Sequence, residues 1–322
     1  MFKSRLTTLF IGLLGGVVYA FIVMLLITAA HRNVSITYIF SLPIILGAIP
    51  VLFSTKEQLK SYKSYLLMPW GITLTFFFLC YIMRFDGMIC LVVIVAPFFI
   101  LGTLGAFLYR LFKLKVKGNG TSLYASLLLP LLVFMIEENI QPTNEFYTVL
   151  STIEVDSDRV NVWENIKNVE SIKNEEIETH FVHVIGIPKP LNGVLDKEGV
   201  GGVRSIVWEK GIKFEEKIKT WNEGNGFSYD INVDPNSISP STLDEHVMIG
   251  GKYFDVVSGS YKIVPKESNR CLVELSCTYR ITTNFNFYGK VWADFIIGDF
   301  NSMILEVVKN RSEQKNNSNI NY

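Results

Sequence analysis

Residues 211–234, GIKFEEKIKTWNEGNGFSYDINVD, contain two stretches in which apolar and polar residues alternate. The first stretch covers 213–221 and the second covers 226–233. Between them, residues 223–226 supply asparagine and glycine, which tight turns favour. Strict alternation predicts strands with one covered side and one solvent-facing side, so we expect an antiparallel sheet in this part of the chain.

The rest of the second half contains further alternating segments and two segments with the periodicity of a helix. Further strands are expected at 147–155, 203–208, 252–264 and 271–282. A short amphipathic helix is expected to end at Lys167, and a long one to run from about Tyr288 to Arg311. The apolar stripe of the long helix is predicted to contain Phe295, Ile296, Phe300, Ile304, Val307 and Val308. These elements predict an α+β domain over 147–312 and a disordered, Asn-rich tail at 313–322.

The charges divide the chain into two halves. The whole chain has 30 basic and 30 acidic residues, and 49% of its residues are hydrophobic. Residues 1–142 hold 11 basic and 4 acidic residues, a surplus of seven positive charges, so the remainder carries seven net negative charges. This asymmetry argues against a basic nucleic-acid binder and against a single soluble domain, and we expect no nucleic-acid partner.

Five uncharged runs precede the predicted sheet, at 6–30, 33–55, 64–83, 87–109 and 118–136. A helix needs about 20 apolar residues to cross a bilayer. The runs therefore predict an α-helical transmembrane bundle of five spans over 1–136, followed by a linker at 137–146. The fifth run contains Pro130 and begins with polar residues, so an interfacial or re-entrant segment is the alternative for it.

The basic residues gather at the N-terminus and in the second and fourth loops of this bundle. By the positive-inside rule, this places the N-terminus in the cytoplasm. With five spans, the C-terminal domain then lies outside the cytoplasm, in a multi-pass protein of the cell membrane. The predicted spans contain no ionisable residue, which favours an anchor over a transport path.

Several motifs in the second half resemble those of the SRPBCC superfamily, whose helix-grip domains include START and polyketide cyclase/dehydrase-like proteins. They are Ile153–Trp163, Gly199–Arg204, Gly211–Trp221, Gly259–Tyr261 and Lys309–Arg311. The resemblance covers about half of the chain. It implies a curved antiparallel sheet wrapped around the C-terminal helix, with an elongated apolar cavity between them. A hydrophobic N-terminal half fused to such a domain resembles membrane-bound proteins of this superfamily.

Glu216 shares one face of its predicted strand with Phe214 and Ile218. If that face lines the cavity, burial raises the pKa of the carboxyl group and suits it to ligand hydrogen bonding or proton transfer. The alternative is an internal ion pair with Arg204, and both remain open. A ligand is predicted to contact the residues expected on the inner faces, namely Arg204, Phe214, Glu216, Ile218, Tyr229, Tyr261 and Phe300.

His246, just before a predicted strand, is the second acid–base candidate, and the alternative for it is a structural role. The chain has no metal-ligand spacing, no phosphate-binding loop and no Gly-x-Ser-x-Gly motif. We therefore expect no metal and no cofactor.

Three hypotheses for function follow. The leading one is a membrane protein whose helix-grip domain binds an apolar or amphipathic small molecule, with membrane lipids among the partners. The second is an enzyme of the cyclase, dehydrase or hydrolase type that uses Glu216 or His246 as acid or base. The third is a membrane sensor or scaffold with a protein partner of unknown identity.

Overall fold

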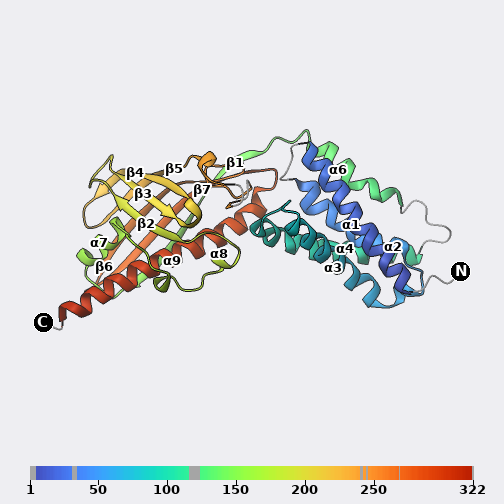
Figure 1. Ribbon diagram of the computed structural model, residues 1–322, viewed down its shortest axis with the longest axis horizontal. Coiled ribbons are helices and arrows are strands. Elements are labelled where there is room, and N and C mark those ends of the chain that lie inside the picture. Colours follow the sequence, from blue (N-terminus) through green and yellow to red (C-terminus); the bar gives the residue numbers. More distant parts are fainter. Residues whose placement is uncertain are drawn as a thin grey trace. The chain divides into compact units, whose positions relative to one another are not determined.

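A computed structural model describes residues 5–30, 35–115, 124–239, 242–243, 246–267 and 269–320. The chain divides into a helical unit, Met1–Pro142, and a sheet unit, Thr143–Tyr322. Figure 1 shows the helices of the first unit in blue to green and the strands of the second in green to red. The division follows the sequence, because long apolar runs give way to alternating segments at this point.

Within its described residues, the helical unit contains three helices that are long and apolar enough to cross a membrane, at Phe10–Ala29, Tyr65–Ile82 and Met88–Lys115. Shorter apolar helices cover Thr37–Phe53 and Ser126–Glu137. A helix of the length of Thr37–Phe53 rises about 25 Å, less than the ~30 Å of a hydrocarbon core. Five spans therefore stay a prediction, and residues 116–123, where the fifth run begins, lie outside the described residues. The elements of the unit are α1 (Arg5–Ala29), η1 (Thr37–Ser41), α2 (Leu42–Phe53), η2 (Gln58–Lys60), α3 (Tyr62–Ile82), α4 (Met88–Lys115), η3 (Ser126–Leu128) and α6 (Leu129–Glu137).

Helix α2 is the central helix of this unit. Nearly all of its residues are buried, and α1, α3 and α4 pack around it. Helix α4 comes especially near, because a Cβ atom on Gly47 would overlap the backbone carbonyl of Gly102. A Cβ atom on Gly105 would likewise overlap the carbonyl of Ile44. Glycines at these positions let two apolar helices pack backbone against backbone.

Two charged side chains hold the ends of the central segment formed by η1 and α2. At its N-terminal end, the Glu137 carboxylate accepts hydrogen bonds from the backbone N–H groups of Ile36 and Thr37, at 2.6 and 3.1 Å. At its C-terminal end, Lys113 Nζ donates to the carbonyls of Val51 and Leu52, at 2.8 and 2.5 Å. A negative charge at the N-terminal end and a positive charge at the C-terminal end both interact favourably with the helix dipole. The sequence assigns Glu137 to a polar linker, whereas the structure buries it as the last residue of α6.

The sheet unit is built on one seven-stranded antiparallel sheet with the strand order β1-β7-β6-β5-β4-β3-β2. The long C-terminal helix α9 packs on β1 and β7, and Figure 1 shows it running beneath the strands. This arrangement matches a helix-grip fold. The strands are β1 (Thr143–Val155), β2 (Pro190–Leu195), β3 (Val203–Trp208), β4 (Lys213–Asn222), β5 (Gly226–Asn232), β6 (Phe254–Lys266) and β7 (Arg270–Thr283). The helical segments are α7 (Arg159–Lys167), η4 (Asn174–Glu176), α8 (Phe181–Val184), η5 (Glu209–Gly211), η6 (Pro235–Ser237) and α9 (Asn286–Ile320).

Strand β2 is an element that the sequence analysis did not predict. It begins at Pro190 and contains Gly193, and both residue types disfavour strands. The strand lies at the edge of the sheet, where a proline costs no ladder hydrogen bond. The sequence signal for this strand is therefore weak, although the edge of the sheet accommodates its proline.

The predicted faces of β4 are wrong beyond Ile218, because the strand contains a bulge. The pairing register with β5 shifts between Ile218 and Thr220. Phe214, Glu216 and Ile218 share one face as predicted, but Thr220 is exposed and Trp221 turns inward. The Trp221 ring lies 4.8 Å from that of Trp163 on α7. An extra residue in one strand reverses the alternation beyond it, and the sequence pattern alone does not reveal this.

Helix α9 is longer than predicted and presents a different stripe at its start. Phe295 was expected on the buried stripe, but 51% of its surface is exposed, and Ile297 occupies the buried side instead. The helix continues to Ile320, through a segment predicted to be disordered. One reason is that Glu313 Oε1 accepts the backbone N–H of Asp156 at 2.9 Å. Residues 321–322 of the predicted tail lie outside the described residues.

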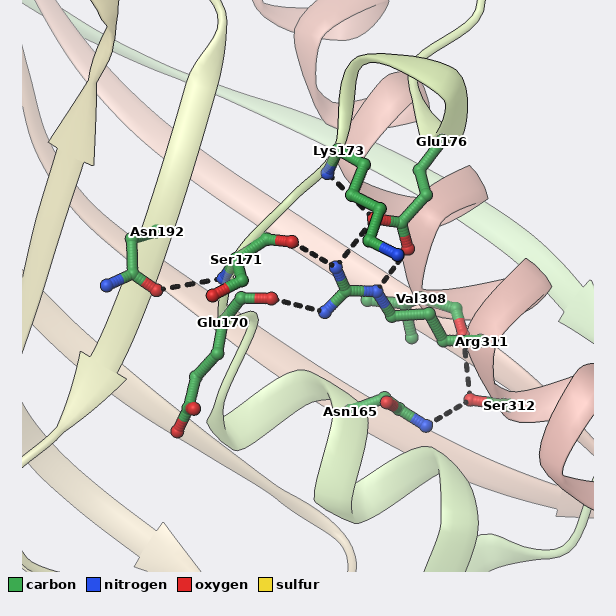
Figure 2. A network of polar contacts seen from close by, with 9 residues as sticks. All are labelled: Asn165, Glu170, Ser171, Lys173, Glu176, Asn192, Val308, Arg311 and Ser312. Atoms are coloured by element: carbon green, nitrogen blue, oxygen red, sulfur yellow. Dashed lines mark hydrogen bonds and ion pairs between the residues drawn. The ribbon is translucent and has the colours of Figure 1, made fainter.

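Arg311 on α9 holds the segment that connects α7 to β2 (Figure 2). Its guanidinium contacts both carboxylate oxygens of Glu176, at 2.6 and 2.9 Å, and donates to the carbonyl of Glu170 at 2.8 Å. Glu176 also accepts the backbone N–H of Lys173 at 2.8 Å. The hydrogen bond from Arg311 is the main cause that lowers the pKa of Glu176. A bidentate contact of this kind fixes the segment against the C-terminal part of α9.

Candidate functional site

Arg204 and Glu216 form an ion pair inside the sheet unit. They face each other across β3 and β4, and their exposed fractions are 4% and 5%. Arg204 Nε and Nη2 both contact Glu216 Oε2, at 2.6 and 2.5 Å. The remaining guanidinium nitrogen, Nη1, donates to the backbone carbonyl of Ile166 at 2.8 Å. Of the two alternatives that the sequence left open for Glu216, the structure shows the internal ion pair.

Three aromatic rings surround the Arg204 guanidinium. Its central carbon lies 5.4 Å from the ring centroid of Phe227, 5.2 Å from that of Tyr229 and 5.4 Å from that of Tyr261. The faces of aromatic rings attract a cation, and the attraction grows when water is excluded. Ile218 is paired with Tyr229 across β4 and β5 and belongs to the same core. The fold therefore brings five of the seven predicted contact residues into one cluster: Arg204, Glu216, Ile218, Tyr229 and Tyr261.

The charges of the pair depend on each other. Burial raises the pKa of Glu216, and the Arg204 guanidinium opposes this effect. Burial alone would lower the pKa of Arg204, but the Glu216 carboxylate holds it above its ordinary value. In this structure the Glu216 carboxylate is therefore engaged by Arg204.

Gly259 makes room for this cluster. It pairs with Tyr229 on β5 and with Cys277 on β7. A Cβ atom on Gly259 would overlap the ring and the hydroxyl oxygen of Tyr229, so only glycine lets this ring cross β6. Burial raises the pKa of the Cys277 thiol to about 12, and the negative charge of Glu216 adds to the effect.

Phe214 and Phe300 belong to a second aromatic group centred on Trp208. The Trp208 ring lies 5.4 Å from that of Phe214 and 4.8 Å from that of Phe300, so β3, β4 and α9 meet here. The sequence analysis named neither Trp208 nor Phe227 as a contact residue. Both follow from alternation, because Trp208 lies four residues after Arg204 on one strand face and Phe227 lies two residues before Tyr229.

His246 lies apart from the ion pair. It is in the connection between η6 and β6, and its ring is 5.7 Å from that of Tyr253. Tyr253 precedes β6, whereas Tyr261 lies eight residues further along, a span of about 26 Å in an extended strand. His246 thus neighbours Tyr253, whereas Glu216 contacts Arg204.

A buried amide without a hydrogen-bond partner lies on α9. Asn301 is only 4% exposed, and its Nδ2 donates to no acceptor among the described residues. It lies one turn from Ile297 and one turn from Leu305, which belong to the two core clusters of the sheet unit. Buried polar groups in native proteins nearly always have a partner, which can be an ordered water or a ligand, and no described residue supplies one for this amide.

His180 joins the N-terminal end of α8 to α9. Its Nδ1 lies 3.1 Å from Asp299 Oδ1, and its Nε2 lies 3.0 Å from Glu306 Oε2. Burial alone would lower the pKa of His180, but the two carboxylates raise it above its ordinary value. The sequence could not show this contact, because the partners are more than 100 residues away. In the described part of the chain, no group of three or more His, Cys, Asp or Glu residues is arranged to hold a metal ion.

No protein-family model matches the chain, and a comparison with curated proteins finds no match. Solved structures of similar fold include norcoclaurine synthase from Thalictrum flavum (15% identity, 54% of this chain and 98% of that chain, TM-score 0.32). They also include an aromatase/cyclase from Streptomyces (11%, 52% and 94%, TM-score 0.34) and a START superfamily protein from Mycobacterium smegmatis (11%, 52% and 97%, TM-score 0.34). Likenesses this distant say nothing of activity, and the fold rests on the strand order and on the packing of α9.

Proposed function

We propose that the protein is a multi-pass membrane protein whose helix-grip domain binds an apolar or amphipathic small molecule, with a membrane lipid as the first candidate. The observation that carries this proposal is the buried Asn301 amide, which lacks an acceptor among the described residues and lies on the sheet-facing helix. A carbonyl, ester or hydroxyl oxygen of a ligand would supply that acceptor.

The surroundings of Asn301 support a ligand of this chemistry. Small-molecule sites are lined mainly by apolar and aromatic side chains, with a few polar groups that fix orientation. The interior of the sheet unit has this composition, with two aromatic groups around Arg204 and Trp208. The Arg204–Glu216 pair has no net charge and therefore favours a neutral or amphipathic ligand over an ion.

The other two hypotheses stay predictions. The acid–base alternative has less support than binding, because Glu216 is engaged by Arg204 and His246 lies elsewhere. The sensor or scaffold alternative requires a protein partner, which stoichiometric co-purification would reveal.

The side of the membrane is part of the proposal. The distribution of basic residues supports a cytoplasmic N-terminus and, with five spans, an extracytoplasmic sheet unit. A reporter that is active only outside the cytoplasm, fused after Tyr322, should be active. An inactive reporter, together with an active cytoplasmic reporter at the same site, would place the sheet unit in the cytoplasm.

Ligand binding is tested on the full chain, purified in detergent from its membrane. Organic extraction followed by mass spectrometry should recover one apolar compound in near-stoichiometric amount. Asn301→Ala should lose most of this compound, whereas Asn310→Ala, an exposed asparagine on the same helix, should retain it. A chain that purifies without any such compound would overturn the proposal, and equal retention by both variants would remove Asn301 from the site.

A further inference from the structure

The outward face of α9 changes character along its length. Near the start of the helix it carries Phe287, Val291 and Phe295, whose exposed fractions are 69%, 66% and 51%. Two turns beyond Phe295, the same face carries Ser302, followed by Glu306. Exposed apolar residues at four-residue spacing are unusual on a solvated helix, and here they occupy only its first turns.

Helix α8 extends this apolar surface sideways. The Phe181 ring lies 5.2 Å from that of Phe295, and Val184, one turn further along α8, is 66% exposed. The apolar patch is therefore formed by Val184, Phe287, Val291 and Phe295. On the side of the later turns of α9, the charged contacts of His180 with Asp299 and Glu306 limit it.

The patch lies where the chain enters the sheet unit. Asn286, the first residue of α9, donates from Nδ2 to the backbone carbonyl of Thr143 at 2.8 Å, and Thr143 is the first residue of β1. The apolar helix α6 ends at Glu137. The connecting residues 138–142 reach roughly 20 Å at most when extended. The end of the sheet unit that carries the patch is thus tethered closely to the end of an apolar helix.

We infer that the patch is a membrane-contact surface, which rests its apolar side chains in the interfacial region of the bilayer that holds the helical unit. This inference rests on the proposed membrane location of that unit. A helix with an apolar face binds to the interface through its buried apolar area. Attraction to anionic lipid does not contribute, because residues 143–322 carry seven net negative charges. The contact therefore forms on neutral lipid and is insensitive to salt.

The pattern along α9 distinguishes this surface from one for a helical protein partner. A partner helix packed along α9 would require apolar residues along the whole face, whereas the apolar character stops before Ser302. A bilayer surface contacts only the part of the domain nearest to it. The rise from Val291 to Ser302 is about 16 Å, enough to leave the second residue in water.

The test uses the full chain in phosphatidylcholine vesicles, with a spin label on a single introduced cysteine. Of the native cysteines, Cys80, Cys90 and Cys271 are buried and Cys277 is half-buried, so the unsubstituted chain provides the labelling background. For Val291→Cys, collisions with oxygen should exceed those with a water-soluble nickel chelate several-fold, at low and at high salt. The matched control, Ser302→Cys on the same face, should show the reverse preference.

Two further sites make the result decisive. A label at Phe78, an exposed residue of α3, reports lipid contact of the helical unit itself. If the label at Phe78 is accessible to oxygen but the label at Val291 is accessible to the nickel chelate, the patch inference fails and the membrane location stands. If the label at Phe78 is itself accessible to the nickel chelate, the membrane location fails. A label at Val291 that neither reagent reaches would mean that protein covers the patch, which also overturns the inference. A label at Val184 should behave like that at Val291 and should lose its oxygen preference in Phe295→Ser.

Discussion

Both units bury charged side chains, but they stabilise them in different ways. In the helical unit, the buried Glu137 and the half-buried Lys113 contact backbone groups at the two ends of one helical segment. In the sheet unit, Arg204 and Glu216 neutralise each other across two strands. Helix ends present unpaired N–H and C=O groups in any sequence, so a charged side chain at a helix end always finds backbone groups to hydrogen-bond. A cross-strand pair exists only when both partners are present. We therefore expect the loss of one partner to cost more in the sheet unit.

Loss of the Glu216 charge should have the largest effect. Glu216→Gln leaves the buried Arg204 charge without a counter-charge, which costs about 3–5 kcal/mol of unfolding free energy. Chemical denaturation of the full chain, followed by tryptophan fluorescence, measures this. Trp163, Trp208, Trp221 and Trp292 all lie in the sheet unit, so the signal reports mainly on this unit.

The double variant Arg204→Met with Glu216→Leu is the matched control. It removes both charges and fills the space with apolar side chains, so its stability should equal or exceed that of the unsubstituted chain. A cost below about 1 kcal/mol for Glu216→Gln alone would show that water reaches the pair and screens its charges.

Glu137→Gln comes next. It removes one strong acceptor and the negative charge from the N-terminal end of the central helical segment, where two backbone N–H groups depend on them. We expect a loss of about 2–3 kcal/mol, measured as a shift in thermal unfolding of the full chain in detergent. Glu138→Gln removes an equal charge from the neighbouring exposed residue and should be nearly neutral. Equal effects of the two substitutions would contradict the capping role.

Gly259→Ala tests whether the Tyr229 ring needs the space that glycine leaves on β6. The added methyl group would displace the Tyr229 ring from its place over β6, at a cost of about 1–2 kcal/mol from overpacking. In Gly298→Ala on α9 the new methyl group meets only ordinary contacts, and alanine favours helix, so stability should be equal or higher. Denaturation of both variants side by side checks this, and a neutral Gly259→Ala would mean that Tyr229 has an alternative position.

The smallest effect concerns pH. The raised pKa of His180 means that its contacts with Asp299 and Glu306 stabilise the fold fully below the unfolded-state value of about 6.5. This contribution is lost as the pH rises through the folded-state value. Denaturation midpoints measured between about pH 5 and 8 should therefore fall more steeply with rising pH than those of His180→Asn. Equal slopes for the unsubstituted chain and His180→Asn would contradict a charged contact of His180 with the two carboxylates.

Much of the sheet could be predicted because alternation is a local property. Strand β3 begins and ends where the sequence predicts, and β4, β5 and β7 differ by a residue or so at their ends. The failures have non-local causes. Strand β2 exists because the edge of the sheet accepts a proline, and Trp221 faces inward because a bulge shifts the register of β4. Phe295 faces outward because the packing of α9, not its apolar content, selects the buried side.

The candidate site was predictable to a similar extent. The residues of the aromatic cluster follow from alternation on neighbouring strands, which is why Arg204, Glu216, Tyr229 and Tyr261 could be named. Whether Glu216 is paired depends on the register between β3 and β4, which residues twelve apart in sequence do not reveal. The unpartnered amide of Asn301 has no sequence signal at all, because any asparagine on a helix looks the same.

By itself, the sequence determined that the chain has an apolar helical half and an alternating half, because hydropathy and periodicity are set by neighbouring residues. It also determined the opposite net charges of these halves. Only the tertiary structure decided that Glu216 is held by Arg204, that Glu137 caps a helix and that the apolar start of α9 lies beside the first residue of β1. The physical reason is distance along the chain: each of these contacts joins segments whose meeting depends on strand register and helix packing, which no local pattern encodes.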